Sequence, residues 1–298
     1  MQQEKIWPLH SRAHKLNHLK GYIKREDELS FGVSGNKLRK LASLIPHLIQ
    51  MGKPHILATG SCYSNFILGL VQHLNEHQFT YTLLLKKPHN WIKGGNLSYL
   101  DLLVDKEQIE WIEKCEPLNK ERCFYIPEGA FCVEALYGSM ELANSIAKNE
   151  QELGINFENI IIDSGTGLGA IGLILGCAQI NKKWKIDIFN MCDTQDQFEK
   201  KLQKMNEELG NKIKLGPYET HELSTAKSYG SMNSTIMKFI NGFAKREGVI
   251  LDPLYSSKLF YELSGPKNGL INDNTLVIHS GGALSLGGFL PEVTEIEG

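Results

Sequence analysis

Residues 24–41 read KREDELSFGVSGNKLRKL, and this stretch carries the first indication of the fold. It opens on five charged residues and leads to Lys37, which directly precedes a helical pattern over residues 38–50. A lysine in a Lys- and Arg-rich segment at a helix start is usually a solvated surface residue. Lys37 is therefore a candidate functional residue only if other segments of the chain support it.

Composition describes an ordinary globular protein. The chain has 298 residues, 42% hydrophobic and 22% charged, which is long enough for two subdomains. A formal net charge of −2 gives a nucleic acid or an anionic membrane no electrostatic support as partner. No apolar run approaches a membrane span, and the N-terminal MQQEKIWPLH lacks the apolar core of a secretion signal. We therefore expect a cytoplasmic protein without a nucleic-acid or membrane partner.

Cysteine and histidine usage argues against disulfides and metals. The six cysteines are scattered, without a CxxC motif, which is typical of reduced thiols in a cytosol. The ten histidines show no HExxH motif, and we read them as dispersed, without a close pair. The sequence therefore predicts no metal site.

Apolar runs alternate with amphipathic stretches along the whole chain. Strands are expected at residues 55–59, 80–85, 108–112, 123–126, 159–163, 186–190 and 276–279. Helices are expected at residues 38–50, 65–74, 133–148, 168–179, 196–209, 235–246 and 258–263. Pro46 should kink or split the first of these helices. Such alternation predicts an α/β architecture with mostly parallel sheets.

Two segments follow an expected strand and open an expected helix. Residues 59–66 read TGSCYSNF, in which Ser64 or Asn65 would cap the helix start. Residues 163–173 read DSGTGLGAIGL, a glycine-rich loop whose backbone amides could close around a phosphate. The same loop also fits a dinucleotide-binding fingerprint, with Asp187 near the required distance downstream.

Two further segments lie near the C-terminus. Residues 247–258 read EGVILDPLYSSK, and residues 276–282 read LVIHSGG. Taken singly, Tyr255 would be an ordinary half-buried tyrosine and His279 a structural histidine.

Taken in order, these segments resemble those of pyridoxal-phosphate enzymes of the tryptophan-synthase-β fold type. They are most similar to the family of aminocyclopropane-carboxylate deaminase and D-cysteine desulfhydrase, which carries Ser-Asn, Asp-Pro-Val-Tyr and His-Thr-Gly-Gly at corresponding places. The resemblance implies a two-domain fold type II enzyme with mostly parallel sheets flanked by helices, and with pyridoxal 5'-phosphate between the domains. Residues 1–43 and 148–298 would form the large cofactor-binding domain, and residues 44–147 a small inserted α/β domain. The family likeness also suggests a homodimer.

The resemblance assigns roles residue by residue. Lys37 would form the imine with the cofactor aldehyde, for which only a primary amine serves. Asn65 would bind the ring hydroxyl and Ser64 the substrate carboxylate, where a helix N-terminus favours anions. Tyr255 would stand at the cofactor and handle protons. Further cofactor contacts are implied for Gly165, Thr166, Gly167, Leu168 and Gly169 at the phosphate, for Tyr229 in the pocket wall, and for Ser280 or Ser256 at the pyridine nitrogen.

Three positions depart from the family pattern. Tyr63 and Phe66 replace polar residues near the substrate, which leaves the substrate identity open. Ser256 stands where deaminases that open the cyclopropane ring carry a glutamate after the tyrosine. A carboxylate at the pyridine nitrogen would keep it protonated, whereas a hydroxyl would leave the ring closer to neutral. We therefore expect a weaker electron sink here.

These features predict a pyridoxal-phosphate-dependent lyase that deaminates a small amino acid. D-cysteine desulfhydrase-like β-elimination ranks first, giving a 2-oxo acid, ammonia and sulfide. Ring opening of 1-aminocyclopropane-1-carboxylate is the close alternative, and racemisation shares the first steps. A degenerate, non-catalytic binder and a Rossmann dehydrogenase are the alternatives from other classes.

Overall fold

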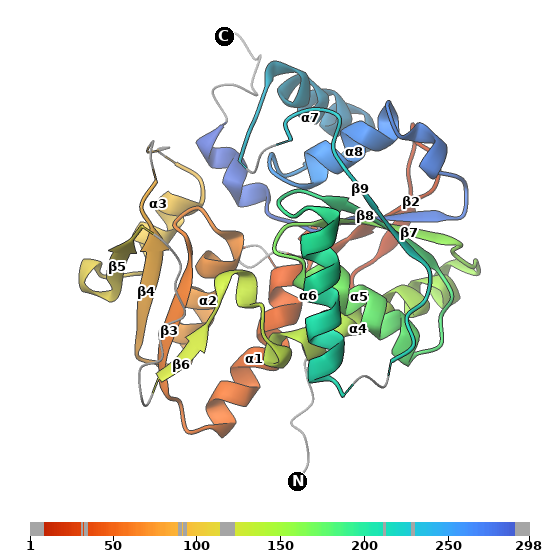
Figure 1. Ribbon diagram of the computed structural model, residues 1–298. Coiled ribbons are helices and arrows are strands. Elements are labelled where there is room, and N and C mark those ends of the chain that lie inside the picture. Colours follow the sequence, from red (N-terminus) through yellow and green to blue (C-terminus); the bar gives the residue numbers. More distant parts are fainter. Residues whose placement is uncertain are drawn as a thin grey trace.

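The computed structural model describes residues 9–30, 32, 35–88, 91, 94–113, 123–210, 213–227 and 230–289. It contains two sheets with helices packed against them (Figure 1). Among the described residues, none of the helices combines the length and apolarity needed to cross a membrane.

The larger sheet has six strands in the order β1-β2-β10-β7-β8-β9. Their bounds are β1 (Ala13–Lys15), β2 (Tyr22–Arg25), β7 (Asn159–Ser164), β8 (Lys185–Asn190), β9 (Tyr218–His221) and β10 (Thr275–His279). All neighbouring pairs are parallel except the β1–β2 pair. The strands β7 and β10 are buried along their whole length, because helices cover both faces of the sheet.

The smaller sheet has four parallel strands in the order β5-β4-β3-β6. They are β3 (His55–Ser61), β4 (Tyr81–Lys86), β5 (Ile109–Ile112) and β6 (Cys123–Ile126). All four lie within the stretch 44–147 that was expected to form an inserted domain. The boundaries at residues 43 and 148 stay a prediction.

Helices cover the larger sheet on its two faces. The helices are α1 (Asn36–Gln50), α2 (Asn65–Glu76), α3 (Asn96–Asp101), α4 (Val133–Leu153), α5 (Leu168–Gln179), α6 (Gln195–Glu208), α7 (Ser234–Glu247) and α8 (Ser256–Ser264). Helices α1, α4 and α5 lie side by side, with α7 and α8 across the sheet (Figure 1). Alternate side chains of β7 follow this division, because Ile160 and Ile162 join the core beneath α4 and α5, whereas Ile161 packs with Phe243 and Phe260.

The expected α/β class with mostly parallel sheets is confirmed, and so are all seven expected strands and all seven expected helices, within a few residues at their ends. The pattern missed β1, β2, β9 and α3, which have at most six residues each, and β2 reads as charged rather than apolar. The expected effect of Pro46 was wrong in one respect. Helix α1 is not split there and runs from Asn36 to Gln50.

Charged residues of the opening stretch are buried beneath α1. Arg39 donates two hydrogen bonds to the Glu26 carboxylate, from Nε at 2.5 Å and from Nη2 at 2.8 Å, and both side chains are almost wholly shielded. Burial opposes the charge on Glu26, but Arg39 prevails and lowers the pKa of Glu26 to about 2. Burial lowers the pKa of Lys24 to about 7, and its Nζ donates to the Asn149 side chain on α4. These bonds fix the start of α1 relative to β2 and α4.

Glu26→Gln should lower the free energy of unfolding by about 3–5 kcal/mol, because it leaves the buried Arg39 guanidinium without its counter-charge. The matched control is Glu28→Gln, which removes a carboxylate from the exposed pair with Arg12 and should change stability by less than about 1 kcal/mol. Urea unfolding of the three proteins measures both values. Equal losses in the two variants would show that the buried pair is not special.

Candidate active site

A cavity of about 290 Å³ lies where the carboxyl ends of strands from both sheets meet the starts of α1, α2 and α5. In parallel α/β sheets this edge is the usual place for a ligand. The cavity brings together eight of the residues expected at the site, namely Lys37, Ser64, Asn65, Gly165, Thr166, Gly167, Gly169 and Tyr255. Leu168, Ser256 and Ser280 are buried near it but are not among its lining residues. Tyr229 lies outside the described residues.

Lys37 is the second residue of α1 and reaches into the cavity. Its Nζ lies 5.2 Å from the centroid of the Tyr255 ring. Burial lowers the pKa of Lys37, an effect that Asp163 and Asp252 partly offset. A lowered pKa increases the fraction of neutral amine, which is the nucleophilic and basic form.

Lys40 lies one turn further along α1 and also lines the cavity. Its Nζ donates a hydrogen bond to the carbonyl of Gly129 at 2.8 Å. Burial, followed by the nearby Lys37, lowers the pKa of Lys40 to about 7. The sequence interpretation overlooked this residue. The signal was its position three residues after Lys37, which places both side chains on one face of the helix.

The glycine-rich loop joins β7 to α5 and forms one wall of the cavity. Gly167 has a φ of 98° and begins α5 without a side-chain cap. The loop is also held by Lys201, a further lining residue, whose Nζ donates to the Thr166 carbonyl at 3.2 Å and pairs with Asp193 at 2.7 Å. Backbone N–H groups at an uncapped helix start and two nearby lysines make this wall a suitable anion site.

The opposite wall is formed by the start of α2. Ser64 caps this helix, and its Oγ accepts hydrogen bonds from the backbone N–H groups of Phe66 and Ile67. Asn65 Oδ1 accepts a hydrogen bond of 2.7 Å from the Asn96 side chain, which fixes the orientation of the amide. The Asn65 Nδ2 atom therefore remains directed to the interior near Gly282, where a Cβ atom would approach it to 2.6 Å.

The two serines expected at the pyridine nitrogen are engaged differently. Ser280 Oγ donates to Asp163 Oδ1 at 2.5 Å, and Asp163 lines the cavity. Ser256 Oγ donates to Asp252 Oδ2 at 2.5 Å and accepts from the Asp252 backbone N–H at 3.0 Å. The hydroxyl of Ser256 is thus held by Asp252, whereas that of Ser280 is joined to a carboxylate of the cavity wall.

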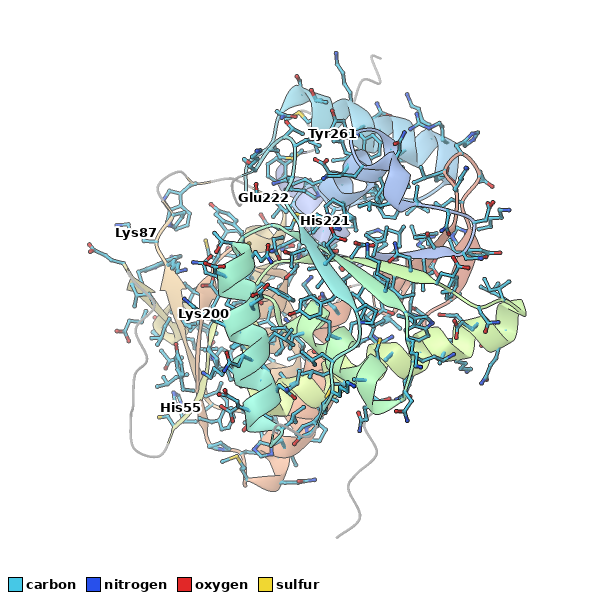
Figure 2. All side chains as sticks on the ribbon, turned by 45° about the vertical axis from the view of Figure 1, so that its right-hand side comes forward. His55, Lys87, Lys200, His221, Glu222 and Tyr261 are labelled. Carbon is cyan, nitrogen blue, oxygen red and sulfur yellow. The ribbon has the colours of Figure 1, made fainter. Side chains whose placement is uncertain are left out.

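Two side-chain groups of the kind that binds metals lie outside this cavity. They are His73, Glu76 and His77 at the end of α2, and Asp187, Glu219 and His221 on β8 and β9. The statement that no histidines pair closely was wrong, because the His73 and His77 rings stack at 6.4 Å, one helical turn apart. His55 and His221, in contrast, lie in different sheets (Figure 2). Neither group contributes to the cavity.

The lining residues fit pyridoxal phosphate. An amine for the aldehyde is present in Lys37, and a cation and backbone donors for the phosphate are present in Lys40 and the glycine loop. Among the described residues, buried oxygen atoms of Asn36 and Ser164 at the cavity wall have no hydrogen-bond partner. Buried polar atoms are nearly always satisfied, so these two atoms indicate a place where a ligand binds.

No family model matches the chain. Individual relatives are similar to it over most of this chain and most of their own length. A putative 1-aminocyclopropane-1-carboxylate deaminase of Pyrococcus furiosus is 28% identical, over 88% of this chain and 84% of the relative. A D-cysteine desulfhydrase of Serratia proteamaculans is 26% identical, over 91% and 89%. A mitochondrial protein of Arabidopsis thaliana, named as bifunctional for these two activities, is 28% identical, over 89% and 73%.

Solved structures show the same fold. An ACC deaminase homologue superposes with a TM-score of 0.80 at 20% identity, covering 97% of this chain and 94% of the other. Diaminopropionate ammonia lyase of Escherichia coli superposes with a TM-score of 0.63 at 12% identity, covering 99% and 88%. With the lysine and the glycine loop together at one cavity, the chain is similar over most of its length to aminocyclopropane-carboxylate deaminases and D-cysteine desulfhydrases, and it shares its fold with solved pyridoxal-phosphate-dependent enzymes.

Proposed function

We propose that the protein is a pyridoxal-phosphate-dependent lyase that deaminates a small amino acid by β-elimination, as a D-cysteine desulfhydrase does. The products would be a 2-oxo acid, ammonia and sulfide. The observation that carries this proposal is the cavity that holds Lys37, with its lowered pKa, between an anion-binding loop and the Tyr255 ring.

The cofactor site would be built from four elements. Lys37 of α1 takes the aldehyde, and the loop 165–169 with Lys40 takes the phosphate. Asn65 of α2 takes the ring hydroxyl, and its orientation is fixed by Asn96. When bound, the cofactor supplies an electron sink for charge that develops at the substrate α-carbon.

The remaining steps fall to side chains of the chain itself. Ser64 binds the substrate carboxylate at the start of α2, where the helix N-terminus favours an anion. Lys37, once displaced by the substrate amine, is a base within the cavity and removes the α-proton. Tyr255 lies against Gly165, where a Cβ atom would approach its ring to 2.9 Å, so its hydroxyl is held at the cavity and can pass a proton to the leaving group.

The alternatives differ in what supports them. Ring opening of aminocyclopropane carboxylate would use Tyr255 and is named for several relatives, and racemisation would need only the first steps. A non-catalytic binder is motivated by Tyr63 and Phe66, and the retention of Lys37, Asn65 and Tyr255 opposes it. The dehydrogenase has the least support, because the Asp187 carboxylate pairs with His221 at 2.6 Å and with Lys185 at 3.1 Å. A cytoplasmic location and a homodimer remain predictions.

Borohydride reduction of the protein with bound cofactor, followed by peptide mapping, should label Lys37 alone. Lys37→Ala should lower kcat by several orders of magnitude, because the group that attaches the cofactor and the base are lost together. Label on Lys40, Lys24 or Lys258 would contradict the assignment.

Lys40→Met should weaken binding of pyridoxine 5'-phosphate, an analogue without the aldehyde, by about tenfold or more at pH 6. The pKa of Lys40 is about 7 in the free protein, so above that pH a proton must be taken up for the ammonium to meet the phosphate. The affinity ratio of wild type to variant should therefore shrink as the pH rises from 7 to 9. Calorimetric titration measures this ratio, with Lys53→Met, outside the cavity, as the control. A ratio that does not depend on pH would remove Lys40 from the phosphate site.

D-Cysteine or a β-substituted alanine should turn over faster than 1-aminocyclopropane-1-carboxylate. The cyclopropane substrate has no α-proton, so proton removal by Lys37 cannot start its reaction. Pyruvate and sulfide assays against an assay for 2-oxobutanoate and ammonia measure the two rates. Faster opening of the cyclopropane than release of sulfide would reverse the ranking of the two activities.

A further inference from the structure

Asp163 differs from the other carboxylates of the cavity. Three carboxylates line it, and two of them are neutralised by lysines, Glu128 by Lys86 at 2.9 Å and Asp193 by Lys201 at 2.7 Å. No described cation lies within ion-pair distance of Asp163, although its side chain is only 3% exposed. A buried carboxylate without a direct counter-charge is unfavourable for folding, so a functional reason for it is to be sought.

The position of Asp163 is set by the larger sheet. It lies in β7, beside β10, and its one side-chain hydrogen bond to a described residue comes from Ser280, directly after β10. Ser280 in turn lies against the start of α1, because a Cβ atom on Gly35 would approach the Ser280 carbonyl oxygen to 1.6 Å. Asp163 and Ser280 thus lie close to the N-terminus of α1, the helix that carries Lys37.

The Ser280 hydroxyl already donates its one proton to Asp163. A hydroxyl has one proton to donate and two lone pairs that accept. Because Ser280 donates to Asp163, its oxygen can only accept a further hydrogen bond. A ring nitrogen that meets Ser280 must therefore bring its own proton.

We propose that Asp163 is a positioning residue that, through Ser280, keeps the pyridine nitrogen of the cofactor protonated. The inference rests on the proposed function and adds to it that Ser280, which lies behind the lining residue Asp163, is the partner of that nitrogen. It assigns to Asp163 the task that a carboxylate next to Tyr255 would otherwise have. Here that place is taken by Ser256, whose hydroxyl is bound to Asp252. The acid has moved from the start of α8 to the end of β7, and the serines at 256 and 280 do not imply a neutral ring.

The charges around Asp163 are consistent with this exchange. Burial raises the pKa of Asp163, and Lys37, Ser280 and His279 lower it in part, while Asp252 raises it further. Lys40 is the other cation whose charge acts on Asp163 from α1. A protonated ring nitrogen beyond Ser280 would add a cation to those that act on this buried carboxylate.

The test reads the proton on the nitrogen directly. The apoprotein is loaded with pyridoxal phosphate that carries ¹⁵N in the ring, and the ¹⁵N chemical shift is followed against pH. Wild type should give the shift of a protonated pyridine at neutral pH. Asp163→Asn and Ser280→Ala should lower the apparent pKa of the ring nitrogen by about 1–3 units. Asp163→Glu should restore part of this loss. The matched control is Asp187→Asn, a buried aspartate of the neighbouring strand, which should leave the shift unchanged.

A neutral ring nitrogen in wild type, or an unchanged nitrogen pKa in either Asp163→Asn or Ser280→Ala, would overturn the inference. If Asp163→Asn does not fold, Ser280→Ala decides, because it breaks the connection and leaves the acid in place. Failure of the proposed function has a different signature. In that case wild type forms no visible absorbance band with the cofactor or releases no sulfide from D-cysteine, whereas failure of this inference alone leaves both the band and the sulfide release and moves only the nitrogen signal.

Discussion

The absence of a side chain at Gly35 is the constraint on which the site depends. The carbonyl oxygen of Ser280 occupies the place where a Cβ atom would be, and Gly35 has a φ of 69°, which other residues rarely adopt. This contact brings the N-terminus of α1 against the end of β10. Lys37 and Asp163 therefore meet in one cavity, although they are far apart in the sequence.

Two similar close contacts complete the cavity. Gly282, with a φ of 103°, lets the Asn65 side chain approach the backbone after β10. Gly129, with a φ of 66°, lies directly on the Thr166 side chain of the glycine loop, and its carbonyl accepts the hydrogen bond from Lys40. In each contact one partner is a glycine without a side chain, and this lets elements near the smaller sheet approach elements of the larger one closely. The space that remains is bordered by backbone and polar groups together with the Phe66 and Tyr255 rings.

Burial tunes the chemistry of these groups in opposite directions. It lowers the pKa of Lys37 and Lys40 and raises that of Asp163, because a charge of either sign is less stable away from water. Lysines become better nucleophiles and bases, and they regain their charge when an anion arrives. The acid, in contrast, is poised to hold a proton jointly with whatever base stands beyond Ser280. Such offsets are a common way for one site to provide an acid and a base at neutral pH.

The sequence by itself determined the α/β class and the candidate residues that local patterns mark, such as the lysine before a helix and the glycine loop between strand and helix. Strand–helix alternation is a local property, and each motif occupies a few consecutive residues, so both are readable without tertiary structure. The short strands β2 and β9 were missed because their pairing with β10 and β8 depends on neighbours distant in the chain, and β1 has only three residues. Only the tertiary structure decided which hydroxyl joins which carboxylate. Ser280 meets Asp163 across 117 positions of sequence, and Ser256 turns to Asp252. No local pattern encodes such contacts, because they arise from the order of strands in the sheet and from backbone approaches that only glycine permits.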